Sequence, residues 1–133
     1  MSRDALDALL AAEIKDEKEV YIKRLDAYFT VRSLTGEEIA QITDEASSWV
    51  GKGAKRRRET DETKFGALVI AKACINPNFA DKRLLEKYGA VSVEEVVMKA
   101  LRPGEIVKIS NEVMELCGFD DDEDEAVEEV KNS

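Results

Sequence analysis

The sequence predicts a mainly helical α+β fold: a small domain of about five helices with an N-terminal β-hairpin and a disordered acidic C-terminal tail. Three patterns support this prediction. Apolar residues recur at helical spacing through most of the chain after residue 35, and they alternate with polar residues between 18 and 34. The stretch 65–75 is apolar nearly all round, with Lys72 as its only charge, so a helix there must be enclosed by its neighbours.

The composition fits one folded domain. The chain has 133 residues, 44% of them apolar, which is enough to bury about two-thirds of its unfolded surface in a single core. We place this domain at 18–119, after an N-terminal arm at 1–17. Residues 120–133 hold eight acidic residues and one basic residue, and such a block of like charge repels itself. We therefore expect these residues to form a disordered tail.

The N-terminal arm contains the sequence DALDALLAAEI at 4–14, with apolar side chains along one side of a short helix. Two interpretations stay open: a helix that orders only against a surface, or a frayed terminus. Behind the arm, the alternation that includes Val20 and Ile22 predicts a β-hairpin turning at Asp26-Ala27.

A helix is expected to follow this hairpin. Thr35 and Glu38 have the spacing of a capping box, in which their side chains would bond to the free amides of a helix start. The helical apolar spacing continues to about Val50, and Gly51 would end the helix. Trp49 is interpreted as a core anchor of this helix.

Residues 51–62, GKGAKRRRETDE, predict a mobile basic loop because they include two glycines and no large apolar side chain. Its basic cluster consists of Lys55, Arg56, Arg57 and Arg58, which are candidate partner-binding residues. They could contact phosphate or an acidic partner. A solvated loop is the favoured interpretation, because no aromatic residue is interleaved with the cluster to stack on bases.

The apolar stretch 65–75 is predicted to be the central buried helix, ended by Asn76-Pro77. Cys74 and Cys117 each fall within an apolar helical pattern, and neither has the spacing of a metal-ligand pair. We expect both to be reduced thiols in the core.

Three further helices are predicted. A short one in 81–89 would stop at Gly89, and a second would start at a capping box formed by Ser92 and Glu95. The last would have Pro103 in its first turn and would run to Gly118.

Val107 and Met114 widen the apolar stripe of that last helix. Either the helix is wedged between two neighbours, or part of it is an exposed docking strip. For this reason both residues are candidate partner-binding residues.

The sequence points away from catalysis. The chain has no histidine and no phosphate-binding or nucleophile-elbow motif, and its acidic tail lacks the glycine and terminal glutamate of a calcium loop. We expect no catalytic residue, cofactor or metal. The net charge of −9 argues against nucleic acid and anionic membrane as partners, and no apolar run is long enough to span a bilayer.

The block NPNFADKRLLEKYGAVSVEEVVMKALRPGEIVKISNEVMELCGF, residues 76–119, resembles the XkdN-like tail assembly chaperones of phages and prophages of Gram-positive bacteria. The resemblance consists of the order and spacing of NPNF, the capped EEVV helix, RPGEI and the closing ELCGF. Upstream, LTGEEI at 34–39 and the apolar helix fit as well. The resemblance covers roughly residues 18–119.

This resemblance implies a small non-enzymatic protein in the host bacterial cytoplasm. It would bind the tape measure protein, keep it soluble, help bring tail tube subunits around it, and leave the finished tail. The sequence also leaves two alternatives: a nucleic-acid-binding regulator that uses residues 55–58, or a structural component of the tail. The oligomeric state is left open.

Overall fold

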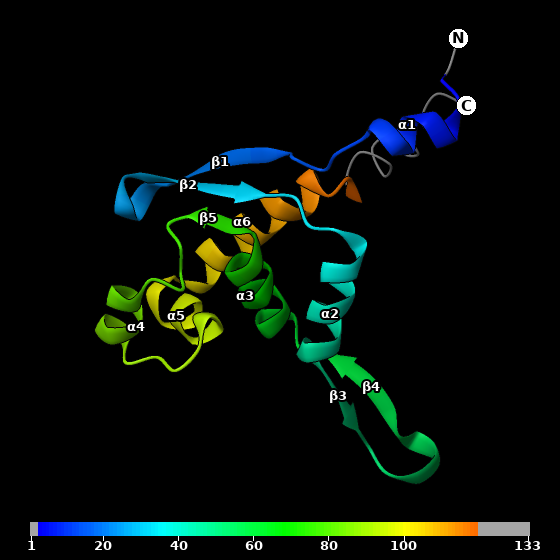
Figure 1. Ribbon diagram of the computed structural model, residues 1–133. Helices are drawn as coiled ribbons and strands as arrows, with labels where there is room; N and C mark the ends of the chain where they lie inside the picture. The colour runs from blue at the N-terminus through cyan, green and yellow to red at the C-terminus, as the bar shows by residue number, and fades with distance from the viewer. Residues whose placement is uncertain (1–2, 120–133) are drawn as a thin grey trace, which may run out of the picture.

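A three-stranded sheet and a layer of helices form the body of the molecule in the computed structural model, which describes residues 3–119 (Figure 1). The elements are α1 (Ala5–Ala11), β1 (Glu17–Ile22), the 3-10 turn η1 (Lys23–Leu25), β2 (Ala27–Arg32), α2 (Gly36–Ala46), β3 (Ser47–Val50), the 3-10 turn η2 (Gly53–Lys55), β4 (Arg57–Thr60), α3 (Glu62–Ala73), β5 (Cys74–Asn76), α4 (Lys82–Tyr88), α5 (Val93–Ala100) and α6 (Pro103–Leu116).

The fold class is mixed α+β, which corrects the prediction of a mainly helical domain with about five helices. Between residues 3 and 119 the chain forms six α-helices and two small sheets. The sixth helix is α1, in the segment predicted as an arm. The additional strands are β3, β4 and β5, which the sequence patterns assigned to helices and to a loop.

The larger sheet has the order β1-β2-β5, and both pairings are antiparallel. Figure 1 shows helices α2 to α6 on one side of this sheet, with α3 and α6 next to it, while α1 lies beyond the end of β1. The inward side chains of the first two strands alternate as predicted: Val20 and Ile22 are buried, and so are Phe29 and Val31. The predicted N-terminal hairpin is therefore confirmed.

The turn of this hairpin differs from the prediction. It is the 3-10 turn Lys23–Leu25 followed by Asp26, so the chain reverses before the predicted Asp26-Ala27 position. Asp26 adopts a left-handed conformation with φ of 47°, which aspartate tolerates better than most residues. Its carboxylate accepts a 2.6 Å hydrogen bond from the Tyr21 hydroxyl across the turn.

The central helix is confirmed by α3. Its residues Ala67, Val69, Ile70 and Ala73 have no exposed surface. The helix ends at Ala73, two residues earlier than predicted, because Cys74–Asn76 become extended and pair with β2.

The two cysteines were predicted as thiols in the core. Cys74, directly after this helix, is buried, and this burial raises the pKa of its thiol to about 12, so that prediction is confirmed. Cys117, directly after α6, is only half-buried and packs against the core. Phe79, the last residue of the NPNF sequence, is buried and packs edge-on against Phe29, with 6.1 Å between the ring centres.

The helix predicted to run from Thr35 to Val50 is too long. Its capping box is confirmed, but α2 ends at Ala46 and the next four residues form β3. The Ala46 carbonyl, left without a partner by the helix end, accepts a 2.8 Å hydrogen bond from the amide of Asp61. Trp49 is 60% exposed, so its assignment as a core anchor is wrong.

The predicted basic loop 51–62 instead contains β4, the second strand of a hairpin. Strand β4 pairs with β3, and the turn between them contains Gly51 at φ 84° and Gly53 at φ 59°. A Cβ at Gly51 would lie 2.6 Å from the carbonyl oxygen of Lys55, so glycine is required there. We call residues 47–60 the basic hairpin.

The remaining helices follow the prediction closely. Gly89 ends α4 in a left-handed conformation, and Pro103 is the first residue of α6. The Ser92 hydroxyl accepts from the amide of Glu95 as expected. The Glu95 carboxylate, however, accepts from the amide of Val91 rather than from Ser92, so this capping box is only half formed.

Three predictions concern features outside this architecture. The predicted disordered tail, 120–133, lies outside the described residues. Among residues 3–119, no helix combines the length and apolar character needed to cross a membrane. The same residues contain no cluster of three or more cysteine or carboxylate side chains placed to hold a metal ion.

Candidate partner-binding surfaces

The candidate residues from the sequence lie on two separate surfaces. Val107 projects from α6 into a groove between helices and is 56% exposed, whereas the basic cluster 55–58 lies on the basic hairpin. Met114 is half-buried against the core. Val107 and Met114 therefore do not form one exposed strip along α6.

The groove beside Val107 lies between α3, α5 and α6 and has a volume of about 190 Å³. Its lining is largely apolar and consists of Glu62, Thr63, Gly66, Met98, Leu101, Pro103, Ile106, Val107 and Ser110. Gly66 is the reason for the close approach of α3 and α6, because a Cβ there would lie 3.2 Å from Cγ2 of Ile106. We call this hollow the α3–α5–α6 groove.

Met98 is the groove residue that sequence reasoning missed. It is 42% exposed and lines the groove from α5, as Val107 does from α6. The sequence does mark this residue: Met98 is an apolar residue directly after Val97 and lies outside the regular apolar stripe of α5. Methionine is flexible and polarizable, and it adapts to differently shaped apolar partners.

The basic hairpin brings an aromatic residue to the basic cluster. The guanidinium of Arg56 lies over the Trp49 ring, 4.5 Å from the ring centre. Arg58 is the direct cross-strand partner of Trp49, so both side chains lie on the same face of the hairpin. The argument that no aromatic residue accompanies the cluster is therefore wrong: Trp49 precedes the cluster in sequence but lies beside it in the fold.

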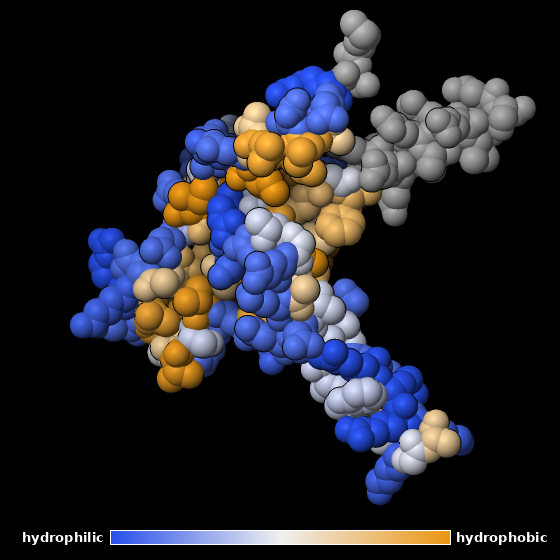
Figure 2. All heavy atoms as spheres, turned by 45° about the vertical axis from the view of Figure 1, so that its right-hand side comes forward, coloured by the Kyte–Doolittle hydropathy of each residue, from blue (hydrophilic) through white to orange (hydrophobic). Residues whose placement is uncertain are grey.

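The other contacts of the cluster are local. Arg58 forms an ion pair with Asp44 on α2, and Arg57 donates a 2.6 Å hydrogen bond to Glu59. Lys55 lies in the turn at the tip of the hairpin. Figure 2 shows the hairpin as a predominantly hydrophilic projection that extends away from the body.

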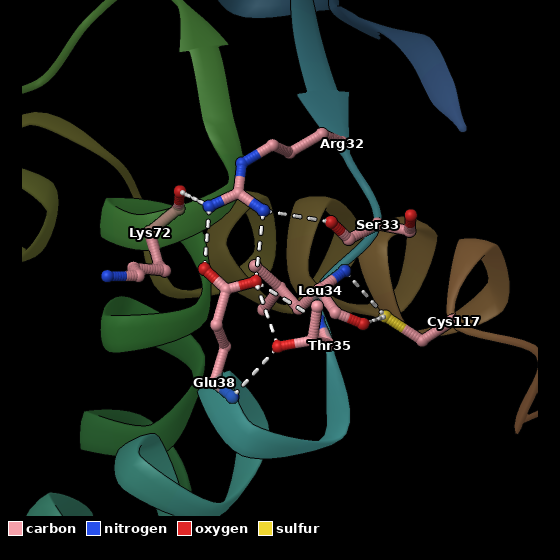
Figure 3. Close-up of polar contacts among 7 residues, drawn as sticks. All are labelled: Arg32, Ser33, Leu34, Thr35, Glu38, Lys72 and Cys117. Atoms are coloured by element: carbon pink, nitrogen blue, oxygen red, sulfur yellow. Dashed lines mark hydrogen bonds and ion pairs between the residues drawn. The ribbon is translucent and has the colours of Figure 1, made fainter. Parts of the chain in front are cut away.

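A polar network around Glu38 fixes the position of α2 (Figure 3). Arg32, at the end of β2, donates hydrogen bonds of 3.1 and 2.8 Å to the two carboxylate oxygens of Glu38, and a 3.3 Å bond to the carbonyl of Lys72 on α3. The Arg32 guanidinium lowers the pKa of Glu38 from about 4.5 to about 2. This network joins the sheet to two helices.

Cys117 adds α6 to the same region. The amide of Leu34 donates to its sulfur at 3.3 Å, and the thiol donates to the Leu34 carbonyl at 3.7 Å (Figure 3). These contacts bind structural elements to one another, so we interpret the cluster as a structural junction.

A wider hollow of about 630 Å³ lies beside η1 and the start of α6. Two of its cations have partners within the fold: Arg24 donates hydrogen bonds of 2.9 and 2.8 Å to Glu105, and Lys108 donates a 2.6 Å bond to the carbonyl of Tyr21. These contacts fasten the β1–β2 turn to α6.

Comparison with known proteins identifies the family. Residues 6–131 match the family described as phage XkdN-like tail assembly chaperone protein. The chain belongs to this family. The match extends beyond residues 18–119, which the motifs of the resemblance cover, and it includes α1 from its second residue onward.

Two proteins of Bacillus subtilis strain 168 are among the relatives of this chain. The phage-like element PBSX protein XkdN is 31% identical over 106 residues, covering 78% of this chain and 72% of XkdN. The uncharacterized protein YqbN is 32% identical over 106 residues, covering 78% of this chain and 71% of YqbN.

The crystal structure of YqbN has a similar fold. It superposes with a TM-score of 0.63 over 90% of this chain and 98% of the YqbN chain, at 20% sequence identity. At that identity the likeness supports the fold alone.

Proposed function

We propose that this chaperone is non-enzymatic, binds the tape measure protein in the host bacterial cytoplasm and keeps it soluble until the tail tube forms around it. It then helps to recruit tail tube subunits and leaves the finished tail. Membership of the tail assembly chaperone family supports the assembly role. The tape measure protein is proposed as the client because the family resemblance implies it.

The α3–α5–α6 groove is the observation that favours this client. A tape measure protein is expected to be long, helical and partly apolar, and such a chain exposes amphipathic helices that aggregate. An apolar groove between helices accepts the apolar face of such a helix. Met98 on α5 and Val107 on α6 both line it with exposed apolar side chains.

Co-expression with the tape measure gene tests the proposal. The wild-type chaperone is expected to raise the soluble yield of the tape measure protein and to co-purify with it. Met98→Asp combined with Val107→Asp should abolish both effects, because charges in the groove cannot be desolvated against an apolar helix.

Val91→Asp is the matched control. Val91 is 95% exposed and does not line the groove, so this variant should behave like the wild type. An unchanged tape measure yield with the wild-type chaperone would contradict the proposed client. Equal losses from the groove variant and the control would contradict the proposed groove.

Recruitment of tail tube subunits is tested by adding purified tube protein to the chaperone–tape measure complex. We expect tube protein to be retained on the immobilised complex and not on the chaperone carrying the groove variant.

A structural role in the tail would instead leave the protein in purified particles, where an assembly chaperone should be absent.

A further inference from the structure

Two elements of the molecule contribute little or nothing to its core. All residues of β4 are exposed, and α1 has no buried residue. Figure 1 places the basic hairpin and α1 at opposite ends of the molecule. We call residues 4–14, which include α1, the acidic arm.

The two elements carry opposite charge. The basic hairpin contains five basic residues and one acidic residue, for a net charge of +4, while the rest of the chain contains 15 basic and 28 acidic residues, for a net charge of −13. The acidic arm contributes three acidic residues and no basic one. The hairpin is thus a positive projection on an otherwise negative protein.

Both elements also expose large apolar side chains. On the hairpin, the Arg56 guanidinium lies over the exposed Trp49 ring, and Arg58 is the cross-strand partner of Trp49. The acidic arm exposes four large aliphatic side chains: Leu6, Leu9, Leu10 and Ile14. A helix of seven residues is too short to be stable by itself in water, so α1 needs a surface that covers this face.

We propose that the acidic arm of one copy binds the Trp49 face of the basic hairpin of a second copy. The leucines of the arm cover the indole ring, and the arm carboxylates face Arg56 and Arg58. The contact joins two copies because the arm and the hairpin of one molecule lie at opposite ends. The acidic stretch 120–133 is the other candidate to bind the Trp49 face, and it carries more negative charge than the arm. Its only large aliphatic side chains are two valines, so it offers less apolar surface to cover the indole ring.

Trp49 is the single tryptophan of the chain, so its fluorescence reports on this contact directly. With the unmodified protein, the emission maximum should move to shorter wavelength as the concentration rises from about 1 μM to about 1 mM, the range of weak interfaces. A synthetic peptide of residues 3–16 added to dilute protein should cause the same shift. The same peptide with Asp7→Arg and Glu13→Arg should not.

A spectrum that responds neither to concentration nor to the peptide overturns the proposal. A spectrum that responds to a single-stranded oligonucleotide and not to the peptide also overturns it, because the hairpin would then be a nucleic-acid surface. Added salt should reverse the peptide-induced shift, since exposed charges are screened.

Charge reversal on each side provides a second test in full-length protein. The variant Arg56→Glu, Arg58→Glu and the variant Asp7→Arg, Glu13→Arg should each sediment as a single chain of 14.8 kDa. An equimolar mixture should assemble to at least twice that mass, because each variant then meets a partner of opposite charge.

The control variant Glu128→Lys, Glu129→Lys should assemble like the wild type. If it is monomeric while the arm variant still assembles, the acidic partner is the C-terminal stretch and the proposal is wrong. A mixture no heavier than its separate components overturns it as well.

Discussion

Ile70 has no exposed surface and lies on α3, which packs against α2, α5, α6 and β2. Truncating it leaves a cavity at the centre of the core, so Ile70→Ala should lower the unfolding free energy by about 2–5 kcal/mol. Leu68→Ala should cost less, because Leu68 is only half-buried. Urea denaturation measures both, with Val91→Ala as an exposed control near zero. Equal decreases in unfolding free energy for Ile70→Ala and Val91→Ala would contradict the burial of α3 in the core.

Glu38 makes stability depend on pH in a defined window. Its pKa is about 2 in the folded protein and about 4.5 when unfolded, so its contribution is complete above 4.5 and is lost as the pH falls toward 2. The difference in unfolding free energy between wild type and Glu38→Gln should therefore shrink over that range. The matched control is Glu37→Gln, which removes an exposed carboxylate on the same turn and leaves the Arg32–Glu38 contact in place. A constant difference between wild type and Glu38→Gln over this range would show that the Arg32 contact does not form.

At the scale of whole elements, the sequence predicts helices that have a buried face, and it misses the basic hairpin, which has none. Helices α5 and α6 bury one face each, and that packing leaves a 3.6-residue apolar period, whereas α3 is apolar nearly all round because its neighbours enclose it. Strand β4 is exposed at every residue and β3 has no buried residue, so no alternation of buried and exposed side chains marks them. Trp49 and Val50 instead continued the helical spacing of α2 by coincidence.

The groove was only partly predictable for a related reason. Val107 is detectable in the sequence because it makes the apolar stripe of α6 wider than one buried helix face requires. The hollow beside it depends on Gly66 in α3, and a glycine adds no apolar side chain from which a hollow could be predicted. The Arg32–Glu38 pair joins β2 to the start of α2. The sequence predicts the capping contact between Glu38 and Thr35, but not the ion pair between Glu38 and Arg32.

The basic hairpin yields a prediction about its own stability contribution. Trp49→Ala should change the unfolding free energy by no more than about 1 kcal/mol, the value of an exposed cation–π contact with Arg56. A buried tryptophan would cost about 3–5 kcal/mol. Thermal or chemical denaturation distinguishes the two, provided that protein concentration is held fixed. A loss in the larger range would show that Trp49 is covered by the protein's own core.

At the scale of the molecule, charge is divided between a nearly neutral body and an acidic C-terminal stretch. Residues 1–119 hold 19 basic and 21 acidic residues, against one and eight in 120–133. The buried core described above lies between Val20 and Val113.

We therefore expect removal of residues 120–133 to leave the thermal unfolding midpoint nearly unchanged, because like charges repel one another and gain little from folding. The matched comparison is a full-length protein in which the eight acidic residues are replaced by Ser, which keeps the length and removes the charge. It should have the same midpoint but lower solubility, since net negative charge keeps a protein dispersed. Calorimetry at two salt concentrations measures the first effect and precipitation assays the second. A large drop in the midpoint of the truncated protein would mean that 120–133 packs against the body.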